Sequence, residues 1–122
     1  NVHEGPQNTN WNSGVRPGGM IPLEEGVLIS DEPGLYLEGK YGIRCENLLI
    51  CKKAEKNDYA QFMNFEVVTL VPFEREAIIL ELLGETELKW LNEYHKHVYE
   101  VVEPLLENKE EKEWLREATA EI

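Results

Sequence analysis

The stretch Tyr41-Gly42-Ile43-Arg44-Cys45-Glu46-Asn47-Leu48-Leu49-Ile50-Cys51 decides the fold of the first half of the chain. It combines aliphatic and polar residues in a pattern typical of a β-strand. Side chains of a strand point alternately to its two faces. Arg44 and Glu46 are therefore expected on the same face, so that a base and an acid point the same way.

Two shorter runs around this stretch also predict strands. Val27-Leu28-Ile29 is a strand core that should end at Glu32-Pro33, because proline cannot donate to a ladder and Gly34 permits a turn. Residues 63–71 are rich in β-branched and aromatic residues, and the polar residues 52–58 are typical of a hairpin connection. Residues 1–25, rich in glycine and proline, indicate a long irregular loop.

After Pro72 the chain becomes helical in pattern and acidic. Residues 73–122 hold fourteen Glu against six Lys and Arg. Gly84 is a tolerable N-cap, and Pro104 should end or kink the first helix near Val102. The expected apolar face of that helix has spacings of three and four: Leu88, Leu91, His95, Val98, Val102 and Leu105. Residues 110–118 predict a second short helix with Trp114 and Leu115 on its buried side.

The composition limits both size and partners. A chain of 122 residues has the size of one domain, and its mixture of 42% hydrophobic and 30% charged residues is that of a folded protein. The formal charge of −12 and the pI near 4.6 argue against nucleic acid or an anionic membrane as partner.

The chain opens at Asn1 without Met, which suggests a piece of something longer. Cys45 and Cys51 would lie about 20 Å apart in a strand, so we expect buried free thiols in a reducing compartment.

Three residues are candidates for chemistry: Glu32 at a strand end, Glu46 inside an otherwise apolar run, and His3 in the glycine-rich loop. A buried carboxylate is costly unless it is paired or binds a metal. Plainer alternatives remain open, namely an ion pair of Glu46 with Arg44 or simple exposure, a turn carboxylate at position 32, and an exposed loop histidine. His95 and His97 are two apart on a helix and face different ways, which favours structural roles for both.

Five segments, taken in order, are similar to the C-terminal end of an aminopeptidase P (Xaa-Pro aminopeptidase) of the M24 metallopeptidase family. The resemblance covers nearly the whole chain. Its helical last two-fifths is similar to the extension of the longer, eukaryote-like members. The segments are Asn1-Val2-His3-Glu4-Gly5-Pro6, Asp31-Glu32-Pro33-Gly34-Leu35-Tyr36, Tyr41-Gly42-Ile43-Arg44-Cys45-Glu46-Asn47, Thr69-Leu70-Val71-Pro72 and Trp90-Leu91-Asn92-Glu93-Tyr94-His95.

This resemblance implies a dinuclear metal site on a pita-bread fold, usually with manganese and in some members with zinc or cobalt. Glu32 matches a metal ligand that also acts as general base, and Glu46 matches the ligand that bridges both metals. His3 matches a histidine that contacts the substrate and assists catalysis, while Tyr36 and Arg44 match positions that contact the substrate or support the ligands. The carboxylates of Glu32 and Glu46 should then converge from neighbouring antiparallel strands.

The family's two aspartate ligands and metal-binding histidine have no counterpart in this chain, so we expect it to be inactive alone. The expected fold is α+β. Residues 1–72 would be the end of the catalytic domain, with antiparallel strands, and residues 73–122 a helical extension. In the intact parent the resemblance implies a cytoplasmic Xaa-Pro aminopeptidase that pairs as a homodimer through its C-terminal region. A non-catalytic dimerisation or peptide-binding module of the same fold, or another M24 hydrolase such as prolidase, are the alternatives.

Overall fold

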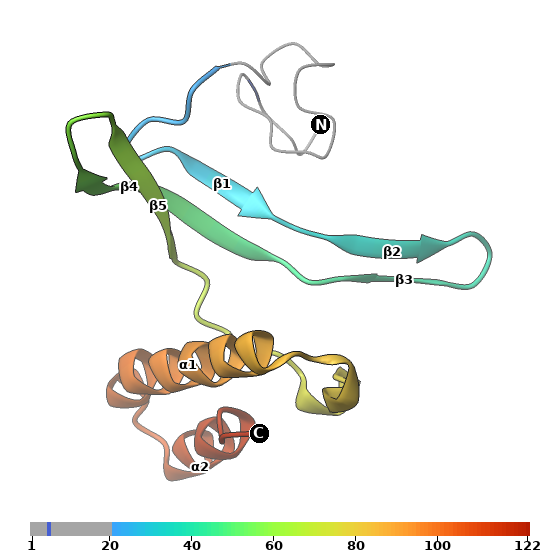
Figure 1. The fold of residues 1–122 in the computed structure, drawn as a ribbon. Helices are drawn as coiled ribbons and strands as arrows, with labels where there is room; N and C mark the ends of the chain where they lie inside the picture. The colour runs from blue at the N-terminus through green and yellow to red at the C-terminus, as the bar shows by residue number, and fades with distance from the viewer. Residues whose placement is uncertain (1–4, 6–20) are drawn as a thin grey trace. The chain divides into compact units, whose positions relative to one another are not determined.

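The computed structural model describes Gly5 and residues 21–122. The chain divides into two compact units, residues 1–69 and residues 70–122. Figure 1 shows strands in the first unit and helices in the second, so the expected α+β class is confirmed. His3 and most of the predicted N-terminal loop lie outside the described residues. None of the helices in the described part is long and apolar enough to cross a membrane.

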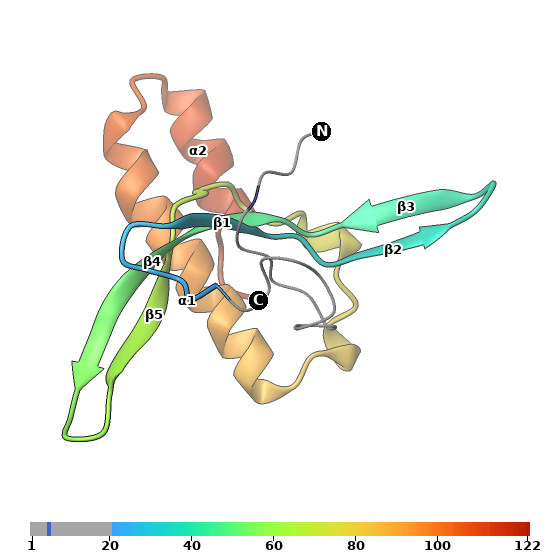
Figure 2. The same ribbon diagram turned by 90° about the horizontal axis from the view of Figure 1, so that it is seen from above.

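The first unit contains two antiparallel sheets. Three strands form one sheet in the order β1-β4-β5 and two form the other, β2-β3. Figure 2 shows β1 running on into β2 and β3 running on into β4, so that the two sheets share one long two-stranded ribbon. The strands are β1 (Leu28–Asp31), β2 (Gly34–Leu37), β3 (Tyr41–Arg44), β4 (Asn47–Lys56) and β5 (Gln61–Val67).

The register of this ribbon is the same on both sides of its interruption. Asp31 pairs with Asn47, and three residues further along the first strand Gly34 pairs with Arg44, three residues earlier on the second. No residue has therefore been inserted into either strand. The interruption falls at Pro33, which has no N–H to give to the ladder. The two sheets are thus one ribbon with a proline in it.

The predicted turn at Gly34 is wrong, because the chain passes through it in extended conformation as the start of β2. The turn comes at the tip of the ribbon instead. There Gly39 has a φ of +69°, a conformation that glycine adopts without strain, and Lys40 N–H donates to the carbonyl of Leu37 at 3.0 Å. The expected burial of both cysteines is half right. Cys51 is buried, but Cys45 is exposed.

Much apolar surface of the first unit is bare. Cys51 is its only fully buried residue among those that the structure describes. Leu35 and Ile43 face each other across the ribbon yet are 57% and 60% exposed. Isolated ribbons of two strands are marginally stable in water. The strands of this unit therefore have faces suited to packing against further protein.

The second unit consists of two helices and short 3-10 turns. Helix α1 (Glu85–Val102) begins after Gly84 and passes into the turn η3 (Glu103–Leu105) that contains Pro104, as predicted. Helix α2 (Lys109–Ala118) starts after Asn108, whose side chain accepts the N–H of Glu110. Two further turns, η1 (Arg75–Ala77) and η2 (Leu80–Leu82), precede α1.

The exposure of Trp114 contradicts one prediction from the sequence. Val98 of α1 is fully buried and Leu115 of α2 is 2% exposed, whereas Trp114 is 61% exposed. Consecutive helical residues point about 100° apart, and the packing of the second unit buries Leu115 and leaves Trp114 on the exposed side of α2. The prediction that Trp114 is buried is therefore wrong.

Two consecutive residues of helix α1 form hydrogen bonds with the first residues of the second unit. The hydroxyl of Tyr94 donates to the carbonyl of Val71 at 2.7 Å, and the N–H of Phe73 donates to Nε2 of His95 at 3.1 Å. His95 is fully buried, whereas His97 is exposed. His95 therefore has a structural role: it accepts a hydrogen bond from the backbone N–H of Phe73.

Candidate functional site

Glu32 and Glu46 occupy opposed positions on the ribbon. They lie one position from the pair Asp31–Asn47 and two positions from the pair Gly34–Arg44, and these two pairs share one register. Cys45 N–H donates to the carbonyl of Pro33 at 3.0 Å, so the position beside that pair is one without ladder hydrogen bonds. Side chains of opposed residues lie closest at such positions. The ribbon therefore directs both carboxylates to one face.

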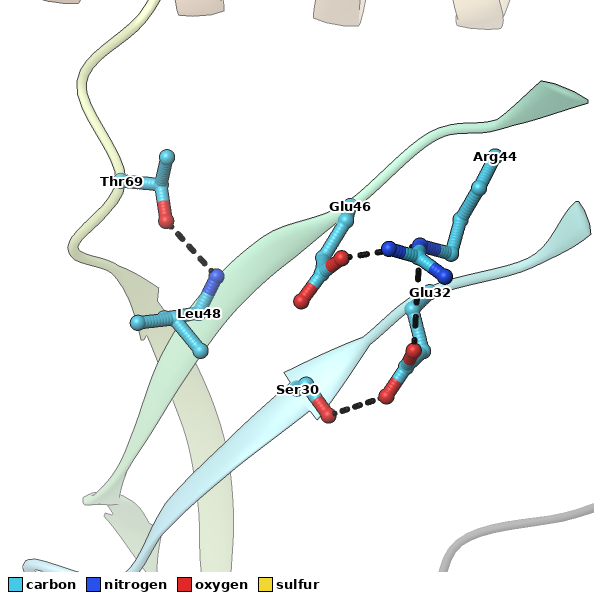
Figure 3. A network of polar contacts seen from close by, with 6 residues as sticks. All are labelled: Ser30, Glu32, Arg44, Glu46, Leu48 and Thr69. Carbon is cyan, nitrogen blue, oxygen red and sulfur yellow. Dashed lines mark hydrogen bonds and ion pairs between the residues drawn. The ribbon is translucent and has the colours of Figure 1, made fainter. Parts of the chain in front are cut away.

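Arg44 lies between the two carboxylates (Figure 3). Its Nε donates to Oε2 of Glu46 at 3.0 Å and lies 3.9 Å from Oε2 of Glu32. Like charges directly opposite each other on a ribbon repel, and an exposed ion pair contributes only about 0–1 kcal/mol. The ion pair of Glu46 with Arg44, one of the plainer alternatives, is thus present. The same geometry makes the face between the glutamates a place where positive charge is favoured.

Two neighbours orient the glutamate at position 32 and the arginine. The hydroxyl of Ser30 donates to Oε1 of Glu32 at 2.7 Å from the same face of the strand. A side-chain hydrogen bond and charge interaction with Tyr36, followed by the charges of Glu46 and Glu32, raise the pKa of Arg44 above its ordinary value. Tyr36 and Arg44, both predicted site residues, therefore interact with each other beside the glutamates.

The ring of Tyr36 lies flat on two glycines of the ribbon. A Cβ added at Gly42, the cross-strand partner of Tyr36, would lie 2.6 Å from its Cδ1. One added at Gly34 would lie 2.6 Å from the phenol oxygen. Such distances are well inside van der Waals contact, so the ring takes the space that side chains at these positions would need. The absence of side chains at both glycines leaves room for the ring and its hydroxyl on the same face as Arg44.

Two polar residues in the neighbourhood of the glutamates were missed from the sequence. One is Ser30, whose position two residues before Glu32 on a strand is the signal that could have found it. The other is Thr69, whose Oγ1 accepts the N–H of Leu48 at 2.8 Å. No spacing rule links positions 48 and 69, because their proximity depends on the pairing of β4 with β5.

The described residues do not contain enough suitable groups for a metal site of their own. Glu32 and Glu46 offer hard carboxylate oxygens from opposed positions, which fit a cation such as Mn²⁺. No group of three or more His, Cys, Asp or Glu suited to a metal occurs within Gly5 and residues 21–122. His95 already accepts a backbone N–H through Nε2. The two glutamates thus fit a ligand set that needs further members.

A groove within the second unit contains none of the predicted site residues. Its volume is about 810 Å³, and its lining includes Asn92, Lys96 and Arg116 of the two helices. The side chain of Asn92 pairs there with the backbone of Ile122 in both directions, at 3.3 and 3.0 Å. The groove is open and of mixed charge, and nothing in it selects a ligand.

Comparison with known proteins gives consistent results. The model of the C-terminal region of peptidase M24 matches residues 61–122. Aminopeptidase P2 of Arabidopsis thaliana is 42% identical over 118 residues, 94% of this chain and 16% of that protein. A probable Xaa-Pro aminopeptidase P of Coprinopsis cinerea is also 42% identical, over all of this chain and 20% of its own length. The chain thus spans about a fifth or less of these relatives.

A solved structure extends the likeness to the fold. The X-prolyl aminopeptidase of Caenorhabditis elegans, described as a cytosolic enzyme with a di-nuclear active site, superposes with a TM-score of 0.82 at 39% identity. The match covers 100% of this chain and 20% of that one. Strands followed by helices in this chain therefore correspond to one region of a larger peptidase.

Proposed function

The chain belongs to the M24 peptidase family, as the C-terminal part of an aminopeptidase P, and from that premise we propose the function of the intact protein. It is a metal-dependent Xaa-Pro aminopeptidase, which removes the N-terminal residue from peptides with proline in second position. The observation that carries this proposal is the opposition of Glu32 and Glu46 on one face of the ribbon. Identity of about 40% to aminopeptidases P over the whole chain supports it.

In this proposal Glu32 and Glu46 are two of five ligands of a pair of divalent ions, manganese in the first place and zinc or cobalt as alternatives. Two such ions supply, when bound, a nucleophilic water at neutral pH and a polarised scissile carbonyl. Glu32, whose carboxylate accepts a hydrogen bond from the Ser30 hydroxyl at 2.7 Å, would hold the ions and also serve as the general base. Glu46, opposite Glu32 on the ribbon, would be the ligand that the two ions share.

Three further residues have roles toward the substrate. Arg44 and Tyr36, which interact with each other beside the glutamates, bind the peptide or hold the ligands in place. His3, outside the described residues, contacts the substrate and steadies the tetrahedral intermediate or moves a proton. With residues 1–72 as the end of the catalytic domain and 73–122 as its extension, this chain alone has too few ligands and is inactive.

The proposal is tested by Glu46→Gln in the intact protein, assayed with an Xaa-Pro peptide and added Mn²⁺. The substitution keeps the size of the side chain but removes its charge, so nearly all activity should be lost. Glu38→Gln is the matched control, because Glu38 is an exposed glutamate at the tip of the same ribbon. An intact protein without Xaa-Pro cleavage, or a Glu46→Gln variant of normal activity, would overturn the proposal.

A homodimer through the C-terminal region is the second part of the proposal. Its support is the exposure of large apolar residues in the second unit, among them Trp90 at 68% and Leu105 at 76%. Large apolar side chains left exposed on a folded unit are a common sign of an interaction surface. Light scattering of the intact protein should give twice the subunit mass, and Trp90→Asp should shift it toward the monomer. A non-catalytic dimerisation module predicts the same dimer but no peptide cleavage.

We assign the intact protein to the cytoplasm. The free thiols Cys45 and Cys51 and the similarity to an enzyme described as cytosolic support this assignment. Imaging of the tagged intact protein tests it, and localisation in the secretory pathway would contradict it.

A further inference from the structure

The ladder between β4 and β5 ends in an unusual way. Val68 N–H donates to the carbonyl of Leu48 at 2.9 Å, as the register of the two strands requires. In a regular antiparallel pair the N–H of Leu48 would return a bond to the carbonyl of Val68. It donates instead to Oγ1 of Thr69 at 2.8 Å (Figure 3). A side-chain hydroxyl thus provides the last bond on this side of β4.

This bond lies close to Glu46 in the sequence, at the start of β4. Glu46 falls between β3 and β4, beside the interruption that Pro33 makes in the ribbon. β5 has already ended at Val67. On the side of β4 that faces β5, the backbone of Leu48, two residues from Glu46, is held by two bonds: its carbonyl accepts from Val68 and its N–H donates to Thr69.

We propose that Thr69 is a positioning residue for Glu46. Its Oγ1 fixes the backbone at the start of β4 and with it the direction of the Glu46 carboxylate toward the metal ions of the proposed peptidase. The inference rests on the proposed function, since it needs Glu46 to be a ligand. Replacing a residue that orients a metal ligand, without itself binding the metal, typically lowers the metal affinity by about 10- to 100-fold.

The experiment uses the intact protein and three substitutions. Thr69→Val has the same shape without the acceptor, and Thr69→Ala removes the hydroxyl without adding a methyl group to the half-buried site. Thr69→Ser keeps the hydroxyl and is the matched control. Calorimetric titration with Mn²⁺ should show affinity lowered by about 10-fold or more in the Val and Ala variants and nearly normal affinity in the Ser variant.

Two further measurements separate positioning from a general loss of structure. Hydrogen exchange at the amide of Leu48 should accelerate in the Val and Ala variants while the amide of Cys51, further along β4, stays protected. The kcat for an Xaa-Pro peptide should fall with little change in KM. Normal Mn²⁺ affinity in both variants, or an equal defect in Thr69→Ser, would overturn the inference. A wild-type protein that neither binds Mn²⁺ nor cleaves the peptide would overturn the proposed function itself.

Discussion

The buried imidazole of His95 allows a prediction whose size follows from the structure. Its Nε2 accepts the N–H of Phe73 at 3.1 Å, so the neutral ring carries its proton on Nδ1. His95→Phe keeps an aromatic ring but leaves the N–H of Phe73 without its acceptor. Leaving a buried donor unsatisfied costs about 1–3 kcal/mol. Because Phe73 is only half-buried, we expect about 1–2 kcal/mol, a 5- to 30-fold change in the local opening equilibrium.

The assay is hydrogen–deuterium exchange of the Phe73 amide in the intact protein, where exchange reports local opening. His95→Phe should accelerate it about 5- to 30-fold after correction for intrinsic rates. His97→Phe makes the same change at an exposed neighbour and should have almost no effect. His95→Gln offers an acceptor in place of Nε2 and should retain most of the protection. Unchanged exchange in His95→Phe, or an equal change in His97→Phe, would refute the reasoning.

The same residue makes the local stability depend on pH. Burial, followed by the charge of Arg75, lowers the pKa of His95 below its ordinary value of 6.5. The unfolded segment therefore binds a proton more readily than the folded one, so the stability is complete above about pH 6.5 and is lost as the pH falls. Between about pH 7.5 and pH 5.5 the loss is at most about 1.4 kcal/mol, or tenfold in opening. The Gln variant should lack this dependence.

Three other predictions follow from burial and close contact. Leu115→Ala should destabilise the second unit by about 2–4 kcal/mol in denaturant unfolding, whereas Trp114→Ala next to it should cost less than about 1 kcal/mol. Without denaturant, a water-soluble thiol reagent should modify Cys45 in this chain quickly and Cys51 only after unfolding, as mass spectrometry of peptides would detect. Gly42→Ala should displace the phenol ring above it and lower the catalytic efficiency of the intact protein several-fold without lowering its melting temperature.

Local patterns were sufficient for the helices of the second unit. The spacing of apolar residues and the proline at position 104 predicted an end or kink of the first helix near Val102, and α1 ends there. Patterns failed where two neighbouring residues were equally apolar, as at Trp114 and Leu115, because only the packing decides which of them is buried.

In the first unit the prediction from the sequence failed at Pro33-Gly34, where it placed a turn. This dipeptide usually marks a turn, but here both residues are extended because cross-strand pairs on either side keep the ribbon straight. The glutamates could be chosen from the sequence through a resemblance. Their partners Ser30 and Thr69 could not, since those contacts depend on register and on which strand is the neighbour.

The uninterrupted register of the ribbon restricts where the chain can change length during evolution. The two glutamates face each other only because equal numbers of residues separate them from the tip at Gly39. An insertion at the tip leaves every pair behind it unchanged, so relatives can differ there freely. A single residue gained or lost within β2 or β3 would instead turn one glutamate to the opposite face. Length variation among functional homologues should therefore concentrate at residues 38–40 and be absent from the two strands that lead to it.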